Sequence, residues 1–272
     1  MSLRLRSVLA SAGVVLARAA AAAPQPERGY GMPRDVSLDG HRVDALIHFT
    51  LVAITVIFVL VLAVMIWSFA RHGRNHAATY THGTRGSVLL VVGFIAFVAL
   101  AVDGSLLVHT LHDMNHVFWN FASAEEPGAI RVEVTGHQWA WAVRYPGPDG
   151  KFDTPDDVVL LNDVRVPVGA PVVVQLASND VIHSFNLPNF RVKQDAVPGM
   201  ITRLRFQGQV PGEYEIACAQ HCGPNHYKMR GILTVLPPEQ YREWLATAEQ
   251  DARRAYDPDD RDAHWGWEWR NE

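Results

Sequence analysis

The only two cysteines of the chain, Cys218 and Cys222, are four residues apart. His226 follows the second cysteine by four residues, and Met229 follows that histidine by three. Thiolate, imidazole and thioether groups are soft or borderline donors, and this mixture favours copper over magnesium, calcium or manganese. Two sulfur atoms this close together could also bridge two metal ions. The segment therefore predicts a copper site that serves electron transfer.

The two cysteines have three other conceivable uses. A disulfide is the default pairing in an oxidising compartment, but a bridge over so short a loop gains little chain entropy and leaves the histidine and methionine unexplained. Zinc has little use for a thioether ligand. A mononuclear blue copper site needs one cysteine, two histidines and a weak axial methionine, so the second cysteine favours a dinuclear copper centre.

A further histidine ligand must come from another part of the chain. His183, in the segment Asn179-Asp-Val-Ile-His-Ser-Phe185, is the best candidate because it stands at the end of a predicted strand, although any one of thirteen histidines could be an ordinary packed side chain. His137 is a second candidate, and His221, between the cysteines, is expected to point away. The aromatic segment Gly136-His-Gln-Trp-Ala-Trp141 is either core packing or an indole near the surface that passes electrons to the metal.

Short strands are predicted from residue 129 onward. Apolar and β-branched runs are separated there by glycine, proline, asparagine and aspartate. Many short strands at such spacing indicate a β-sandwich or β-barrel. The predicted strands are Ile130–Thr135, Val158–Val166, Pro171–Leu176, Ile201–Phe206, Tyr214–Cys218 and Ile232–Val235, and Glu239–Ala255 is predicted as an amphipathic helix.

Two long apolar runs precede this domain. Leu46–Ala70 contains one histidine and no full charge, and Ser87–Leu111 contains one aspartate. Each run exceeds the roughly 20 residues needed to cross a bilayer, and two buried helices of this kind would be out of proportion in a soluble domain of this size. The loop 71–86 carries three arginines and no acid, which places it in the cytoplasm and the chain after residue 112 outside.

The first residues resemble a secretory signal, since Arg4 and Arg6 are followed by an apolar stretch and then by a run of alanines. An uncleaved N-terminal segment is the alternative. The net charge of −4 offers no basic surface for nucleic acid. The expected organisation is a signal peptide at 1–23, an exported segment at 24–45, a transmembrane hairpin at 46–111 (helices 46–70 and 87–111, cytoplasmic loop 71–86), a domain at 115–236, and a C-terminal helix and tail at 237–272.

Together these segments resemble subunit II of haem–copper cytochrome c oxidases, as a divergent bacterial member. The resemblance runs from the first apolar run to about residue 236, and it implies a membrane-anchored all-β fold: two N-terminal transmembrane helices, a cupredoxin-like Greek-key β-barrel and a short C-terminal helix. The matching segments are the two apolar runs, Gly136-His-Gln-Trp-x-Trp, Asp180-Val-x-His-Ser-Phe, Lys193-Gln-Asp-Ala-Val-Pro-Gly199 and Cys218-x3-Cys-Gly-x2-His-x2-Met229.

The resemblance also implies a ligand set for a dinuclear copper centre of the CuA type. Both cysteines would bridge the two ions, and the other ligands would divide between them. The implied set is Cys218 and Cys222 as bridges, His183 and Met229 on one ion, and His226 and the backbone carbonyl of Gln220 on the other. Trp139 would be the tryptophan through which electrons enter.

The function that the resemblance implies is electron transfer within cytochrome-c oxidase (EC 7.1.1.9). The chain would accept electrons from cytochrome c and pass them to the haem of subunit I, which reduces oxygen to water with proton translocation. Subunit III is a further implied partner. The bilayer would be the bacterial inner membrane, with the C-terminal domain in the periplasm.

Three features qualify the resemblance. Most relatives carry glutamate where this chain has Gln220, and because that carboxylate also contacts magnesium, magnesium binding is in doubt here. Relatives usually place glutamate at the start of the second span, near a proton-uptake path, where this chain has Ser87. The chain has no Cys-x-x-Cys-His motif and therefore no attachment site for haem c.

Two other functions remain open. The chain could be the CuA subunit of a nitric oxide reductase, or a membrane-anchored copper-binding assembly protein. Copper delivery sites are usually exposed and rich in methionine, and the aromatic segment would be superfluous in one. The segment 148–157, which contains four aspartates, could steer a basic cytochrome c, form a solvated turn, or, less in keeping with its spacing, bind calcium.

Overall fold

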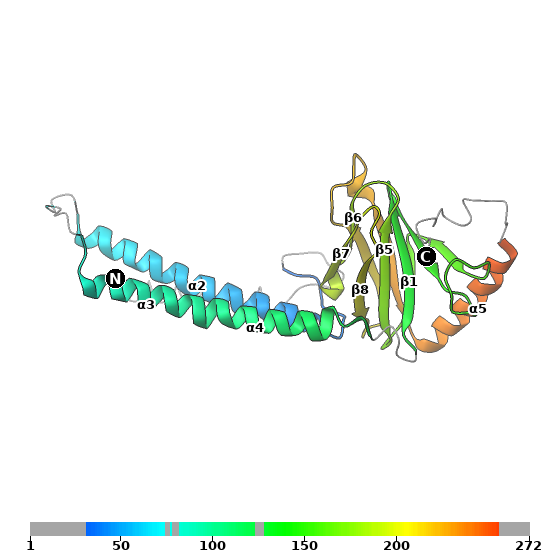
Figure 1. The fold of residues 1–272 in the computed structure, drawn as a ribbon, viewed down its shortest axis with the longest axis horizontal. Helices are drawn as coiled ribbons and strands as arrows, with labels where there is room; N and C mark the ends of the chain where they lie inside the picture. Colours follow the sequence, from blue (N-terminus) through cyan, green and yellow to red (C-terminus); the bar gives the residue numbers. More distant parts are fainter. Residues whose placement is uncertain (1–30, 74–76, 78–81, 123–127, 256–272) are drawn as a thin grey trace, which may run out of the picture. The chain divides into compact units, whose positions relative to one another are not determined.

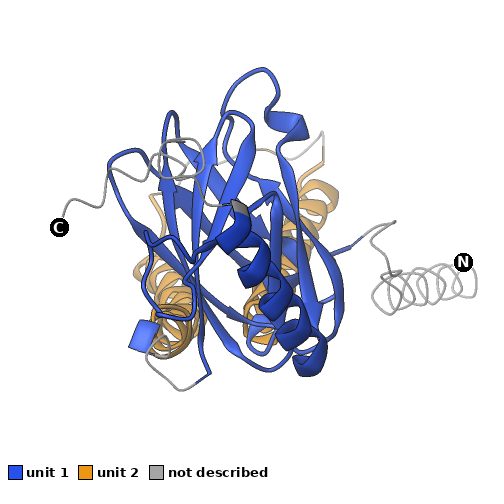
Figure 2. Cartoon of the chain, turned by 90° about the vertical axis from the view of Figure 1, so that its right-hand side faces the viewer, with its two compact units in different colours: residues 1–40, 121–272 blue, residues 41–120 orange. Residues whose placement is uncertain are grey.

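The computed structural model describes residues 31–73, 77, 82–122 and 128–255. The expected signal peptide at 1–23 and the tail beyond residue 255 lie outside these residues. The chain divides into two compact units (Figure 2): residues 41–120 form one, and residues 1–40 with 121–272 form the other.

The unit of residues 41–120 consists of two long helical segments (Figure 1). Helix α2 spans Gly40–Arg71. The second segment runs from Arg85 to Phe118, and both segments are long and apolar enough to cross a membrane. Its successive parts are α3 (Arg85–Phe97), the π-helical stretch η1 (Val98–Asp103), α4 (Gly104–Asp113) and a second π-helical stretch η2 (Met114–Phe118). Both segments therefore extend beyond the spans expected at 46–70 and 87–111.

Side-chain caps fix where these helices begin. Ser37 Oγ accepts a hydrogen bond of 2.8 Å from the backbone N–H of Gly40 at the start of α2. At the start of α3, Thr84 and Ser87 bond reciprocally to each other's backbone N–H, which is the capping-box arrangement. Ser87, where the resemblance would place a glutamate, thus has a structural role in starting the second helix.

The other unit contains a β-sandwich of two five-stranded sheets. In strand order the sheets are β3-β2-β1-β5-β8 and β4-β10-β9-β6-β7. The pairs β1·β5 and β10·β4 are parallel, and the other neighbours are antiparallel. The strands are β1 (Ile130–His137), β2 (Ala140–Tyr145), β3 (Val158–Leu161), β4 (Asp163–Pro167), β5 (Pro171–Ser178), β6 (His183–Leu187), β7 (Val192–Ala196), β8 (Thr202–Gln207), β9 (Gly212–Cys218) and β10 (Arg230–Leu236).

The expected fold class is confirmed: two apolar N-terminal helices precede a cupredoxin-like β domain and a short C-terminal helix, α5 (Pro238–Ala255). The β domain has the form of a two-sheet sandwich rather than a closed barrel. Its core comes from alternate residues of both sheets, such as Val132, Val172 and Ile216, which are fully buried. Burial of each such side chain contributes about 1.5–3 kcal/mol, so the apolar core holds the strands on which the site is built.

The prediction of one strand over Val158–Val166 is wrong. The chain turns at Asn162, whose φ of +57° lies in the left-handed region, and β3 and β4 on either side join different sheets. Asparagine tolerates this conformation better than most residues. Its Oδ1 also accepts a hydrogen bond of 2.8 Å from Trp141 N. This bond holds the turn at which the chain passes from one sheet to the other. Strands β2, β6 and β7 were not among the predicted strands, although β6 carries His183.

Candidate metal centre

The cysteine loop connects β9 to β10 at one end of the second sheet. Cys218 is the last residue of β9, and its N–H donates to the carbonyl of Met229 at 3.1 Å, immediately before β10 begins. The two ends of the loop are therefore side by side. Strand β6 pairs with β9 at Phe185 and Cys218, and Ala219 N donates to Ser184 O at 2.9 Å. This pairing brings the first residue of β6, His183, next to the loop.

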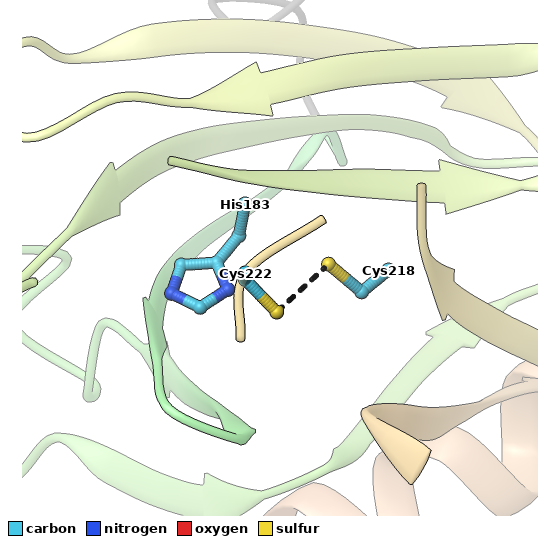
Figure 3. Close-up of side chains that lie close together, drawn as sticks. All are labelled: His183, Cys218 and Cys222. Atoms are coloured by element: carbon cyan, nitrogen blue, oxygen red, sulfur yellow. Dashed lines mark hydrogen bonds between the residues drawn. The ribbon is translucent and has the colours of Figure 1, made fainter. Parts of the chain in front are cut away.

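The two thiols are separate groups. The distance from Cys218 Sγ to Cys222 Sγ is 3.8 Å, compared with about 2.05 Å in a disulfide. The potential ligand atoms of His183 and both cysteines all lie within 4.8 Å of one another (Figure 3). Two soft sulfurs and an imidazole nitrogen at this separation are suited to a thiophilic metal ion.

Three further donors of the cysteine loop lie beside these sulfurs. Cys222 Sγ is 3.7 Å from Met229 Sδ and 3.6 Å from His226 Nδ1. Cys218 Sγ is 3.2 Å from the carbonyl oxygen of Gln220. The structure thus gathers all six side-chain and backbone donors that the sequence analysis named, and the donors present fit a copper site.

The imidazole of His183 is oriented by Asp180. Nε2 lies 2.8 Å from Asp180 Oδ1, an acceptor that holds the proton on Nε2 and leaves the lone pair on Nδ1. Nδ1 is buried and has no hydrogen-bond partner among the described residues, and the ring edge that bears it is turned toward the sulfurs (Figure 3). A carboxylate on the outer nitrogen of a metal-binding histidine is a common way of orienting the ligand. Nδ1 is thus left free of the carboxylate and faces the two sulfurs.

The surroundings of the two cysteines shift their pKa values in opposite directions. Burial favours the neutral thiol of Cys218, but contacts with His183 and with the backbone outweigh it and lower the pKa of Cys218 to about 6. Burial, followed by the neighbouring Cys218, raises the pKa of Cys222 to about 12. The opposite directions of the two pKa shifts make Cys218 the sulfur that loses its proton first, and the thiolate is the form of cysteine that binds a metal ion.

Trp139 lies in the turn between β1 and β2, against the cysteine loop. A Cβ atom at Gly223 would be 3.3 Å from both Cζ2 and Nε1 of its indole. Trp141, two residues further on, is instead fully buried, and its ring packs edge-to-face on His183 with the centroids 5.9 Å apart. The aromatic segment therefore contains one half-buried indole beside the site and one core side chain beneath it.

Neither of the other two histidine candidates belongs to the group formed by His183, Cys218 and Cys222. His137, at the end of β1, lies outside the group formed by His183 and the two cysteines. His221 is exposed, and its ring packs edge-to-face on His226. Sequence reasoning did not assign a role to Asp180, although its position three residues before His183 inside the quoted segment was a signal that could have identified it.

The acidic segment 148–157 folds back onto a buried arginine. Arg144 Nη1 lies 3.1 Å from Asp153 Oδ1, and Arg144 Nε lies 3.6 Å from Asp157 Oδ2. Asp157 also accepts the backbone N–H of Asp153 at 2.7 Å. Two of the four aspartates therefore anchor the segment. Steering of a cytochrome by its remaining charge stays a prediction.

Comparison with known proteins places this domain in a family. Residues 130–235 match the family model described as "Cytochrome C oxidase subunit II, periplasmic domain". The chain is 29% identical over 280 residues to cytochrome c oxidase subunit 2 of Cereibacter sphaeroides, an alignment that covers 88% of this chain and 89% of that protein.

Two further similarities concern the β domain. The chain is 36% identical over 151 residues to the alternative cytochrome c oxidase subunit 2 of Bradyrhizobium diazoefficiens; this covers 47% of the chain and spans about half, 54%, of that relative. The crystal structure of the periplasmic domain of subunit II of cytochrome oxidase (CoxB) of Bradyrhizobium japonicum is similar with a TM-score of 0.41 at 28% identity, covering 45% of this chain and 94% of that one. The match of residues 130–235 to the family model, and the similarity of the chain to these two subunit 2 relatives, support a divergent member of the cytochrome c oxidase subunit II family.

Proposed function

We propose that this chain accepts electrons from cytochrome c at a dinuclear copper centre and passes them to the haem of a partner subunit. The observation that carries the proposal is the buried Nδ1 of His183, which faces the two separate thiols of Cys218 and Cys222. A site built for structure alone would join the sulfurs in a disulfide.

The ligands would divide as the family resemblance implies. Cys218 and Cys222 would bridge two copper ions, His183 and Met229 would bind one ion, and His226 and the carbonyl oxygen of Gln220 would bind the other. The contacts of Cys222 with Met229 and His226, and of Cys218 with the Gln220 carbonyl, support this assignment. The proposal does not extend to magnesium, since the Gln220 side chain has no carboxylate.

The protein residues keep the ligand set rigid. A copper pair held here would take up and give back one electron at a time. His183 and Met229 are buried, and strands β6, β9 and β10 fix their backbone positions, so the donors need to move little when the charge of the site changes. Trp139 is partly exposed and packs against the cysteine loop at Gly223, so an electron from an external donor would reach the site through it.

The partners follow from the family. Subunit I would carry the haem and reduce oxygen to water, subunit III would complete the assembly, and the activity would be that of cytochrome-c oxidase with proton translocation. The two apolar helices would anchor the chain in the bacterial inner membrane, with the β domain in the periplasm. The two long apolar helices, and the match of residues 130–235 to a family model for a periplasmic domain, support this placement.

Electron paramagnetic resonance of the copper-loaded full-length chain in detergent tests the proposal. We expect the hyperfine pattern of one unpaired electron shared by two copper nuclei, and its loss in both Cys218→Ser and Cys222→Ser. Met200→Leu is the control, because Met200 is exposed and has no part in the ligand cluster. A single zinc ion, a mononuclear copper spectrum or a dinuclear signal that survives Cys→Ser replacement would contradict the proposal. Assembled complexes would then be assayed for reduction of oxygen and of nitric oxide to separate an oxidase from a reductase.

A further inference from the structure

Gln138, immediately before Trp139, links two parts of the metal site through two different groups. Its backbone N–H donates to Asp180 Oδ2 at 2.7 Å, and the same carboxylate binds Nε2 of His183 through Oδ1. Its side-chain Nε2 donates to the carbonyl oxygen of Cys222 at 2.7 Å. One residue thus connects the turn that carries the indole to both the histidine side and the cysteine side of the site.

The side-chain bond is specific to the fold around it. Cys222 is buried, and its Sγ lies 3.7 Å from Met229 Sδ, so the carbonyl that accepts this bond belongs to a residue of the candidate metal site. The indole of Trp139 packs on the adjacent residue, where Gly223 leaves room: a Cβ there would be 2.8 Å from Gln138 Nε2 and 3.3 Å from the ring. The amide and the indole therefore share one surface of the cysteine loop.

We propose that Gln138 is a positioning residue that holds Trp139 in contact with the cysteine loop through its side-chain hydrogen bond to Cys222. The inference rests on the proposed role of Trp139 as the residue through which electrons enter. The hydrogen bond from the Gln138 backbone N–H to Asp180 fixes one end of the turn, and any residue other than proline at 138 would retain it. The hydrogen bond from the side-chain amide of Gln138 to the carbonyl oxygen of Cys222 fixes the other end of the turn, and only this bond depends on glutamine.

Loss of the hydrogen bond from Gln138 Nε2 to Cys222 O should slow electron transfer without altering the copper ligands. In the assembled complex, Gln138→Met keeps the length of the side chain but removes the donor, and Gln138→Asn keeps the amide but is too short to reach Cys222 O. For both variants we expect the limiting rate of copper reduction by saturating ferrocytochrome c to fall about fivefold, the change in population expected when one ordinary hydrogen bond is lost. The copper spectrum and the KM for ferrocytochrome c should stay unchanged.

The matched control is Gln207→Met. Gln207 Nε2 makes the same kind of bond, at 2.7 Å, to the carbonyl of Gly169, outside the ligand cluster, so its loss should not affect the limiting rate. Amide hydrogen exchange measured by mass spectrometry adds a readout independent of activity: peptides that cover residues 136–142 should exchange faster in both Gln138 variants and not in the control.

The possible outcomes distinguish the inference from the function on which it rests. If Trp139→Phe slows copper reduction but neither Gln138 variant does, the positioning role is wrong and the role of Trp139 stands. A raised KM at an unchanged limiting rate would show that Gln138 contacts the donor instead, and a lost copper signal would show that it holds the ligands; either result overturns the inference. If Trp139→Phe itself has no effect, the proposed path through Trp139 fails.

Discussion

The imidazole of His183 occupies the space above Gly136 so closely that a side chain at position 136 has no room. A Cβ atom built there would lie 2.8 Å from Cδ2 and 3.0 Å from Cγ of the ring. Gly136 is buried within β1, opposite Trp141 of β2, and Trp141 also packs edge-to-face on the imidazole. The ring, which comes from the other sheet, therefore packs against two paired residues of β1 and β2.

Gly136→Ala should displace His183 and weaken copper binding. The added methyl group must push either the ring or the strand, and overpacking of this kind costs about 1–3 kcal/mol. Because the backbone at Gly136 does not require a left-handed conformation, the effect should come from the contact itself. Copper titration followed by visible absorption would measure the affinity. Gly93→Ala is the control, since a Cβ at Gly93 meets nothing within 4 Å; equal effects of the two substitutions would contradict the prediction.

Asp180→Ala should lower copper affinity by about 10–100-fold, the usual consequence of removing the partner of a metal-binding histidine. Asp180 Oδ1 lies 2.8 Å from Nε2 of His183 and 2.6 Å from the N–H of Val181, so its loss frees both the ring and the loop. Asp180→Asn keeps an oxygen acceptor and should lose less affinity. The copper titration and the electron paramagnetic resonance spectrum are the measurements. Asp251→Ala, an exposed aspartate on α5, should leave both unchanged; an Asp180→Ala variant that matches it would refute the orienting role.

The chemistry of the site could be predicted from sequence because its donors are mostly local. Cys218, Cys222, His226 and Met229 all lie within twelve consecutive positions of the sequence, and the donor types alone favour copper. His183 could be predicted from its motif, but not its distance from the sulfurs. That distance depends on the pairing of β6 with β9, a long-range contact that no local pattern specifies.

The sequence could not predict features that depend on two elements folding together. The apolar run through Val158–Val166 has the composition of one strand, and only the left-handed turn at Asn162, bonded to Trp141, divides it between two sheets. Trp139 and Trp141 look equivalent in the sequence. Trp139 lies in a turn and is partly exposed, whereas Trp141 lies in β2 and is fully buried. That difference in burial appears only when the hairpin forms.

Met229→Leu should keep copper bound but shift the reduction potential of the site. Met229 is 1% exposed, and its Sδ lies 3.7 Å from Cys222 Sγ, so leucine of similar volume fills the space without supplying a donor. Weak axial ligands tune copper potentials, and the loss of the thioether should raise the potential. Redox titration of the visible bands would measure the shift. Met200→Leu, at an exposed methionine, should leave the potential unchanged, and an equal potential in both variants would exclude Met229 as a ligand.

Arg144→Ala should lower the free energy of unfolding of the β domain far more than the loss of a surface ion pair would. The side chains of Arg144 and Asp157 are only 2% and 5% exposed, and Glu133, directly opposite Arg144 in β1, is also buried. Burial raises the pKa of Asp157 despite the nearby guanidinium, which shows how poorly a charge is tolerated there. Removal of one partner of a buried pair costs about 3–5 kcal/mol.

The control for this substitution is Arg230→Ala, since Arg230 pairs with Glu215 at 2.6 Å but is 66% exposed, and exposed pairs contribute about 0–1 kcal/mol. Urea unfolding of the detergent-solubilised chain, followed by near-ultraviolet circular dichroism, compares the two. Because the acidic segment 148–157 is anchored by Arg144, its peptides should also become more accessible to protease in the Arg144 variant only. Equal destabilisation by both substitutions would mean that the buried cluster adds nothing beyond a surface contact, and that the acidic segment is held by its own turns.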